Sequence, residues 1–134
     1  MAGGKRILIA DDDPDIVDLL EAYCRKKGLE VFSVPNGKEA LRRLESEKFD
    51  LVLMDVMMPY IDGYHVTYEA TSKPGVVPPK VLIMTSRDVA SERGIAMLSG
   101  AQDVIQKPFT LDELDRKVDR LLESPAEGPR PRND

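Results

Sequence analysis

The chain has few thiols, imidazoles and aromatic rings: one cysteine, one histidine and no tryptophan in 134 residues. The single Cys24 cannot form an internal disulfide, which is typical of proteins kept in a reducing compartment. With one histidine and one cysteine, the sequence offers no His/Cys cluster for zinc. Its apolar runs are no longer than a strand and no charged-then-apolar leader opens the chain, so we expect neither a membrane span nor a signal peptide. These absences predict a soluble cytoplasmic protein.

Charge and composition narrow the class of protein further. The net charge of −5 argues against a broad nucleic-acid-binding face. A content of 42% hydrophobic and 32% charged residues is ordinary for a globular domain. The length is that of one domain.

Short apolar segments alternate with segments of helical spacing along most of the chain. Strands are expected at residues 6–10, 29–34, 51–55, 80–84 and 101–106. Helices are expected at 14–27, 38–47, 64–72 and 88–99, with a last helix capped by Thr110. This alternation predicts one parallel sheet with helices on both faces, a doubly wound flavodoxin-like α/β fold of strand order 2-1-3-4-5. We expect the domain to span residues 1–123, and residues 124–134, which are rich in proline and poor in apolar residues, to be a disordered tail or linker.

Polar side chains stand where four of the expected strands end. The strands at 6–10, 51–55, 80–84 and 101–106 lead, in that order, to Asp11 and Asp12, to Asp55, to Thr85 and Ser86, and to Lys107. Neighbouring carboxylates repel unless a cation neutralises them, and oxygen-only ligands suit Mg²⁺, which is often shared with a phosphate. Hydroxyl and ammonium groups can hold phosphate oxygens, which leaves Asp55 as the natural attacking group. The pattern predicts a site for a phosphoryl group beside Mg²⁺.

In this order and spacing, the motifs resemble the receiver domain of two-component response regulators, the phospho-acceptor partners of histidine kinases. The resemblance covers residues 5 to about 123. It rests on the acidic pair Asp11-Asp12, on Asp55 followed by Met58-Pro59 and Asp62-Gly63, on Thr85, and on Lys107-Pro108-Phe109.

The resemblance implies a role for each of these residues. Asp55 is the implied phospho-acceptor. Asp12, Asp55 and the backbone carbonyl of Met57 would bind Mg²⁺ directly, and Asp11 would do so through water. Thr85, Ser86 and Lys107 would bind the phosphoryl group, and Lys107-Pro108 would be a cis peptide. The partner would be a histidine kinase or a phosphotransfer protein, and the chain would be a phospho-acceptor that catalyses its own phosphorylation and dephosphorylation, not an enzyme with external substrates.

Two positions depart from the pattern seen in many receivers. Val104 stands where an aromatic residue often moves inward with the switch residue, and Ser86 stands where alanine is common. We therefore expect the signal to travel through the loop after Thr85 and the helix that contains Gly94. Leu98 and Val104 could form an apolar spot on the output face, which the resemblance associates with partner docking; buried packing is the alternative.

The residues that follow Asp55 and Thr85 also bear on how long the phosphoryl group survives. Met57 and Arg87 stand two places after these two residues. Neither supplies a carboxylate or an amide to orient an attacking water, so we expect slow loss of the phosphoryl group.

Two other functions fit part of the pattern. A phosphohydrolase of the haloacid dehalogenase type could use Asp11, Asp13, Thr85 and Lys107, although it would give Asp55 no role. A degenerate receiver could serve only as a binding module. The cognate kinase, the downstream partner, a dimer formed on phosphorylation and attachment to a larger protein are left open by the sequence.

Overall fold

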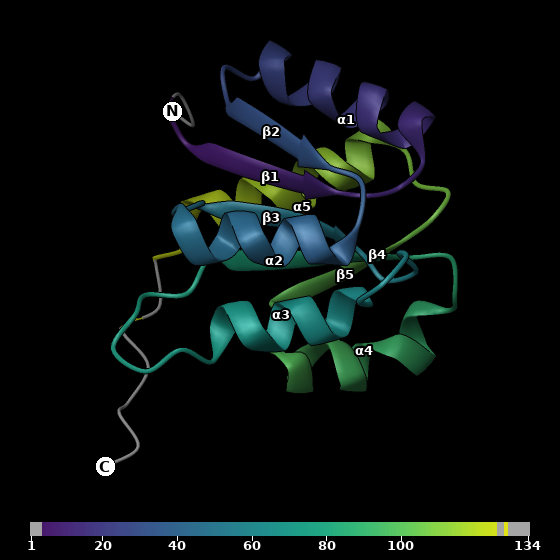
Figure 1. Cartoon of the computed structure of the whole chain (residues 1–134). Coiled ribbons are helices and arrows are strands. Elements are labelled where there is room, and N and C mark those ends of the chain that lie inside the picture. Colours follow the sequence, from purple (N-terminus) through teal and green to yellow (C-terminus); the bar gives the residue numbers. More distant parts are fainter. Residues whose placement is uncertain (1–3, 126–127, 129–134) are drawn as a thin grey trace.

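The computed structural model describes residues 4–125 and 128, and shows strands and helices alternating throughout (Figure 1). The strands are β1 (Arg6–Ala10), β2 (Glu30–Val34), β3 (Leu51–Asp55), β4 (Lys80–Thr85) and β5 (Asp103–Gln106). The helices are α1 (Pro14–Lys26), α2 (Gly37–Ser46), α3 (Gly63–Thr71), α4 (Val89–Ser99) and α5 (Leu111–Glu123). Most of residues 124–134, the expected tail, lie outside the described residues.

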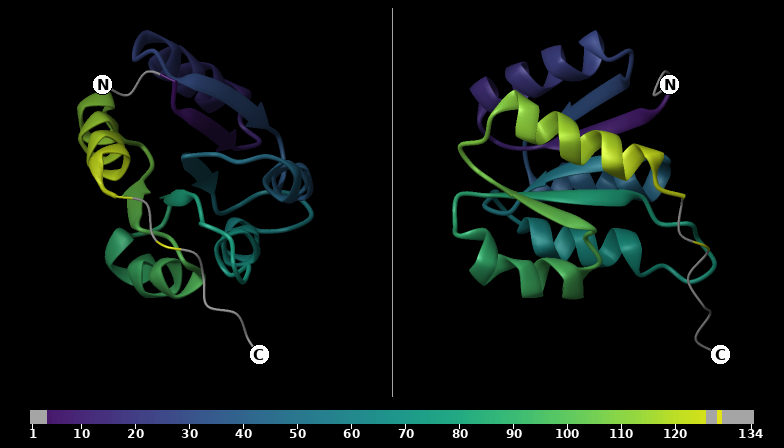
Figure 2. Two further views of the ribbon diagram at one scale, coloured as in Figure 1. Left: turned by 90° about the vertical axis from the view of Figure 1, so that its left-hand side faces the viewer. Right: turned by 180° about the vertical axis from the view of Figure 1, so that it is seen from behind.

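All neighbouring strands pair in parallel, in the order β2-β1-β3-β4-β5, so the predicted fold is confirmed. Helices α1 and α5 cover one face of the sheet, and α2, α3 and α4 cover the other (Figure 2). Among the described residues, no helix combines the length and the apolar character that crossing a membrane requires.

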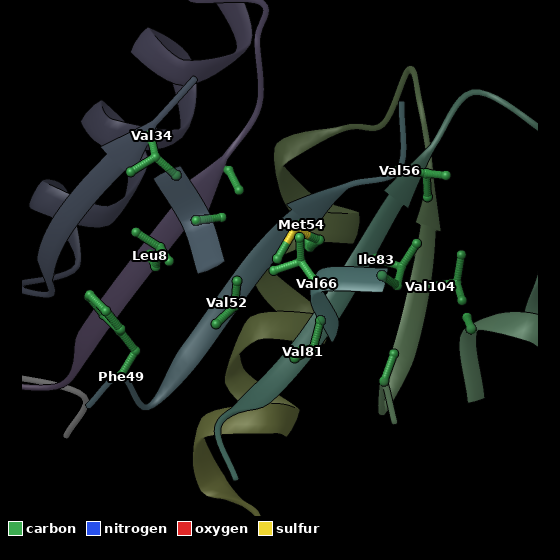
Figure 3. Packing of buried hydrophobic residues seen from close by; sticks show 14 residues of the cluster. Leu8, Val34, Phe49, Val52, Met54, Val56, Val66, Val81, Ile83 and Val104 are labelled. Carbon is green, nitrogen blue, oxygen red and sulfur yellow. The ribbon is translucent and has the colours of Figure 1, made fainter. Parts of the chain in front are cut away.

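The core consists of two apolar layers, because successive side chains of each strand point to opposite faces of the sheet. In the layer under α2, α3 and α4, Val52, Met54 and Ile83 pack around Val66 (Figure 3). In the layer under α1 and α5, Leu53 and Leu82 belong to the same cluster as Leu20 and Leu114. Strands β3 and β4 are buried along their whole length, so they carry apolar residues on both faces.

Helix ends follow the capping residues in the sequence. Asp13 accepts a hydrogen bond from the Asp15 amide at 3.0 Å and precedes Pro14, so it caps α1, which begins at residue 14 as predicted. Thr110 accepts from the Glu113 amide at 3.1 Å and caps α5.

Two details differ from the sequence-based expectation. Strand β5 begins at Asp103 and not at residue 101, because Gly100 ends α4 with a left-handed backbone (φ 107°) and the Ala101 amide still bonds back to Ala96. By its spacing from Leu114, Val118 and Leu121, Leu111 belongs to the apolar stripe of α5, but it is 45% exposed. It is the first residue of α5.

Candidate functional site

The predicted site residues meet at the carboxyl edge of the sheet. The strand register sets Ala10 beside Met54, Asp55 beside Met84, and Thr85 beside Gln106, so residues at or just beyond these strand ends lie at one edge. The side chains fall into a buried group, Asp11, Asp55 and Thr85, and an exposed group, Asp12 and Ser86, with Lys107 between them in exposure.

Three carboxylates form the centre of this site. Asp11, Asp12 and Asp55 each offer an oxygen, and these three oxygens lie within 4.8 Å of one another. Asp11 is held in place through both of its oxygens: Oδ1 accepts from the Asp13 amide at 3.0 Å, and Oδ2 faces the Lys107 ammonium. The cluster is therefore fixed on its buried side and open on the side of Asp12.

Lys107 is the cation of the cluster. Its Nζ lies 2.7 Å from Asp11 Oδ2 and 3.2 Å from Asp55 Oδ1, with 15% of the side chain exposed. It follows β5 and precedes Pro108 through a cis peptide bond, as the resemblance implied. One ammonium against three carboxylates leaves a negative charge that is partly buried.

The surroundings shift the pKa of Asp55 and Lys107 in the same direction. Burial, aided by the charge of Asp11, raises the pKa of Asp55 to about 6, although Lys107 partly opposes this rise. For Lys107, burial lowers the pKa, but the hydrogen bond to Asp11 and the charges of Asp55 and Asp11 outweigh burial and raise it. Burial, and after it the charge of Asp11, thus disfavours the ionised form of Asp55, whereas the neighbouring carboxylates favour the charged form of Lys107.

The loop after Asp55 approaches it closely. A Cβ at Gly63 would lie 2.3 Å from the Asp55 carbonyl oxygen, so only glycine lets α3 begin there. Asp62 caps α3 by accepting from the His65 amide at 3.0 Å. Tyr60, which lies between Pro59 and Asp62, has a left-handed backbone (φ 75°) and is 82% exposed.

On the β4 side, the loop contacts Thr85 through its backbone. Thr85 Oγ1 accepts a hydrogen bond from the Arg87 amide at 3.0 Å. The Arg87 guanidinium lies 3.8 Å from the sulfur of Met57 and 3.7 Å from a carboxylate oxygen of Glu92. Met57 and Arg87, which were expected to flank the site, therefore contact each other at its rim.

The structure corrects the expected apolar spot on the output face. Val104 is 1% exposed and packs in the layer near Ile83 (Figure 3), because its side chain points to the face of the sheet that α4 covers. Leu98 is 85% exposed, as expected. The predicted apolar spot made of both residues is wrong. Of the two, only Leu98 is exposed on the output face.

Reasoning from the sequence missed Glu92 and Tyr64. Glu92 is 8% exposed although it is charged, and the hydroxyl of Tyr64 donates to it at 2.8 Å. The two residues are on different helices, 28 positions apart, and form no sequence motif. The helical phase of α4, which turns Glu92 toward α3, was the only signal that could have found them.

The donor set fits a hard divalent cation. The oxygens of Asp11, Asp12 and Asp55 lie close together without His or Cys ligands, and two of the three side chains are buried. Their excess negative charge over Lys107 is what a divalent ion would neutralise. The haloacid dehalogenase alternative fits less well, because Asp13 is exposed and its Oδ1 caps α1.

A sheet of order 2-1-3-4-5 with acidic residues, a hydroxyl and a lysine at its carboxyl edge defines a class of α/β signalling domains, and comparison with known proteins agrees. The family model "Response regulator receiver domain" matches residues 7–119. The chain belongs to the family of response regulator receiver domains.

Individual relatives support the same assignment. The Bacillus subtilis alkaline phosphatase synthesis transcriptional regulatory protein PhoP is 34% identical over 88% of this chain and 48% of its own. The receiver domain of a sensor histidine kinase from Pseudomonas aeruginosa, which has a magnesium ion coordinated in its active site cleft, is 30% identical with a TM-score of 0.81 over 91% of this chain and all of its own. Thermotoga maritima TrrA, in complex with Mg²⁺-BeF, is 35% identical with a TM-score of 0.77 over 88% of this chain and 99% of its own. The chain spans about half the length of the curated relatives that it matches first.

Proposed function

We propose that Asp55 accepts a phosphoryl group from the phosphohistidine of a histidine kinase or phosphotransfer protein, in a reaction that depends on Mg²⁺. The observation that carries this proposal is the placement of Asp55: its carboxylate ends the buried strand β3, lies beside two more carboxylates, and is 3.2 Å from Lys107. This is the arrangement that an attacking oxygen next to a metal and a counter-charge requires.

Asp12, Asp55 and the backbone carbonyl of Met57 would hold the Mg²⁺ directly, and Asp11 would hold it through water. When bound, the ion neutralises the carboxylates and the oxygens of the incoming phosphoryl group. The exposure of Asp12 leaves that side of the cluster open to the phosphodonor.

The protein's own side chains account for the transfer. An oxygen of Asp55 attacks phosphorus, the P–N bond to the donor imidazole breaks, and the imidazole nitrogen keeps the electron pair and takes a proton from solvent. Lys107 balances the charge on one phosphoryl oxygen, and the hydroxyl of Thr85, aided by Ser86 at the rim, donates to another. The phosphoryl group is lost by hydrolysis: water attacks phosphorus, and the carboxylate of Asp55 is the leaving group.

Readout by a partner is part of the proposal. The α4–β5–α5 face, on which Leu98 is exposed, would change when Asp55 is phosphorylated. The names of matched relatives include transcriptional regulators, and the chain spans 48% and 37% of two of them. A downstream segment or separate protein partner, and a dimer formed on phosphorylation, are therefore the candidates for output.

The test is phosphorylation with acetyl phosphate and Mg²⁺, followed by mass spectrometry of the intact and digested protein. We expect one phosphoryl group on Asp55, none in Asp55→Asn, and none without Mg²⁺. Label on Asp11 with turnover of phosphate esters would favour the phosphohydrolase. No label at all would favour a receiver that only binds partners.

A further inference from the structure

A second polar cluster lies beside the phosphorylation site and joins three segments. The hydroxyl of Tyr64 on α3 donates to Glu92 Oε1 at 2.8 Å, and the guanidinium of Arg87, in the β4–α4 loop, lies 3.7 Å from the same oxygen. Glu92 is 8% exposed, which is rare for a carboxylate unless it is paired. Helices α3 and α4 run side by side under the sheet (Figure 1), so Glu92 lies where they meet.

Arg87 connects this cluster to the phosphorylation site through its backbone amide and through its guanidinium. Its amide is bound to Thr85 Oγ1 at 3.0 Å, and its guanidinium lies 3.8 Å from the sulfur of Met57, two residues after Asp55. Its side chain is 59% exposed, so it is free to turn. The same cation is therefore within contact of the loop that carries Asp55 and of a carboxylate on α4.

Phosphorylation changes the balance between these two anions. An acyl phosphate carries about one negative charge more than a carboxylate and has three strong acceptor oxygens. A guanidinium matches phosphate geometry well and forms two parallel hydrogen bonds to it. Glu92 offers Arg87 a single negative charge, and one of its oxygens already accepts a hydrogen bond from Tyr64.

We propose that Arg87 is a further phosphoryl-binding residue, and that Glu92, oriented by Tyr64, is a positioning residue that holds Arg87 away from Asp55 until Asp55 is phosphorylated. The proposal rests on the proposed function of Asp55. When Arg87 turns to the phosphoryl group, Glu92 loses its cation at the start of α4. The contact between α3 and α4 loosens there. This gives the chain a route to α4 that does not need an aromatic residue at position 104, where Val104 is fixed in the core.

The test is the affinity of the full chain for beryllofluoride with Mg²⁺, a mimic of the phosphoryl group, measured by fluorine NMR. Glu92→Gln keeps the shape of Glu92 and an acceptor for Tyr64 but frees Arg87. We expect it to bind beryllofluoride about two- to fivefold more tightly than wild type, the range expected from a partly exposed ion pair. Arg87→Gln is expected to bind more weakly than wild type.

The double variant separates this mechanism from a general charge effect. In Arg87→Gln, adding Glu92→Gln should change the affinity no further. If Glu92→Gln tightened binding equally without Arg87, Glu92 would act only by repelling the anion, and the proposal would be overturned. Glu69→Gln is the matched control: it removes one charge from the exposed face of α3, where Glu69 lies 3.8 Å from His65, and should leave the affinity unchanged. A gain in Glu69→Gln equal to that in Glu92→Gln would also overturn it.

Amide exchange gives an independent readout, and the response of wild type to beryllofluoride is the part that a merely structural role of Glu92 would not produce. In wild type, beryllofluoride should increase exchange in the first turn of α4, and in Glu92→Gln this turn should exchange faster before beryllofluoride is added. Unchanged exchange in both proteins would contradict the proposal. Failure of Asp55 as acceptor is distinguishable, because wild type itself would then not bind beryllofluoride.

Discussion

Both edges of the sheet contain buried or partly buried charged groups, but these groups are fully paired at only one edge. At the amino edge, the Lys80 ammonium donates to the carbonyls of Leu121 and Ser124 at 2.9 and 2.5 Å, where α5 ends. Arg6 lies over the rings of Phe32 and Phe49, 4.8 and 4.7 Å from their centroids, and pairs with Glu47. At the carboxyl edge, the carboxylates of Asp11, Asp12 and Asp55 lie together, and Lys107 pairs with Asp11 and Asp55.

The contrast separates structural from functional charge. Cations at the amino edge have enough acceptors around them, so they join helix, strand and loop and stabilise the fold. The three carboxylates at the other edge have a single ammonium beside them, and in the proposed function they bind Mg²⁺ and Asp55 takes the phosphoryl group. The presence of a cavity does not distinguish the functional edge, because a cavity of about 630 Å³ lies at the amino edge, between α2 and the loop before β4.

The largest expected effect is the pH dependence caused by Asp55. Burial raises its pKa from 3.8 to about 6, so the folded state favours the protonated form. Stability from this group is complete below pH about 4 and is lost as pH rises through about 6. The loss is at most about 3 kcal/mol in the free energy of unfolding of the metal-free protein.

Urea unfolding at pH 4 and pH 7 measures this loss, and Asp55→Asn is the control because it cannot titrate. The variant should lose less stability than wild type between these two pH values, and excess Mg²⁺ should reduce the loss in wild type. Equal losses in wild type and Asp55→Asn would show that the carboxyl edge is as well compensated as the amino edge.

The second prediction concerns the amino edge. Lys80→Met keeps most of the stem but removes the ammonium, which leaves the carbonyls of Leu121 and Ser124 without this donor. We expect a loss of about 2 kcal/mol in the free energy of unfolding, because buried acceptors that lose a charged partner are costly. Phosphorylation of Asp55 and the affinity for Mg²⁺ should stay unchanged in the folded variant. Weaker Mg²⁺ binding would mean that the two edges are coupled.

The third prediction concerns the lifetime of the phosphoryl group. Met57 is 62% exposed at the rim and cannot orient a water. Met57→Asn supplies an amide, and we expect loss of the phosphoryl group to become about tenfold faster, equal to about 1.4 kcal/mol of barrier. Phosphorus NMR or intact mass over time follows it. Met57→Leu is the control, and an asparagine variant as slow as the leucine variant would contradict the prediction.

Much of the fold followed from the sequence because its signals are local. Apolar runs of strand length, capping residues such as Asp13 and Thr110, and right-handed crossovers leave few arrangements. The site followed too, because residues at the ends of parallel strands meet at one edge. Asp11, Asp55 and Lys107 were therefore placed together before any distance was known.

Contacts between elements could not be predicted in the same way. Whether Val104 faces solvent depends on how far α4 reaches over β5, and no pattern within β5 encodes that. Glu92 looks like any exposed helical glutamate until α3 brings Tyr64 to it. Leu111 fits an apolar stripe by spacing, yet it is exposed in the first turn of α5. In each case the helix position relative to its neighbours, and not the local sequence, decides exposure.

The two edges also differ in backbone strain. The prediction that tests this difference has the smallest expected effect on the free energy of unfolding. The left-handed positions among residues 4–125 that are glycine, Gly4, Gly28, Gly75 and Gly100, all lie in loops at the amino edge. The left-handed position at the carboxyl edge is Tyr60, where the Ile61 amide also bonds to the Pro59 carbonyl at 3.0 Å, a strained γ-turn.

Tyr60→Gly tests whether this strain is a property of the functional edge. Glycine removes a steric cost of about 1 to 2 kcal/mol but gains freedom in the unfolded chain, so we expect a net stabilisation of about 0.5 to 1 kcal/mol. The ring is exposed and little packing is lost. Tyr60→Ala, which removes the ring but keeps the Cβ, should give no such gain in urea unfolding. If glycine and alanine were equally stable, the carboxyl edge would store no strain at Tyr60, and the two edges would differ in charge alone.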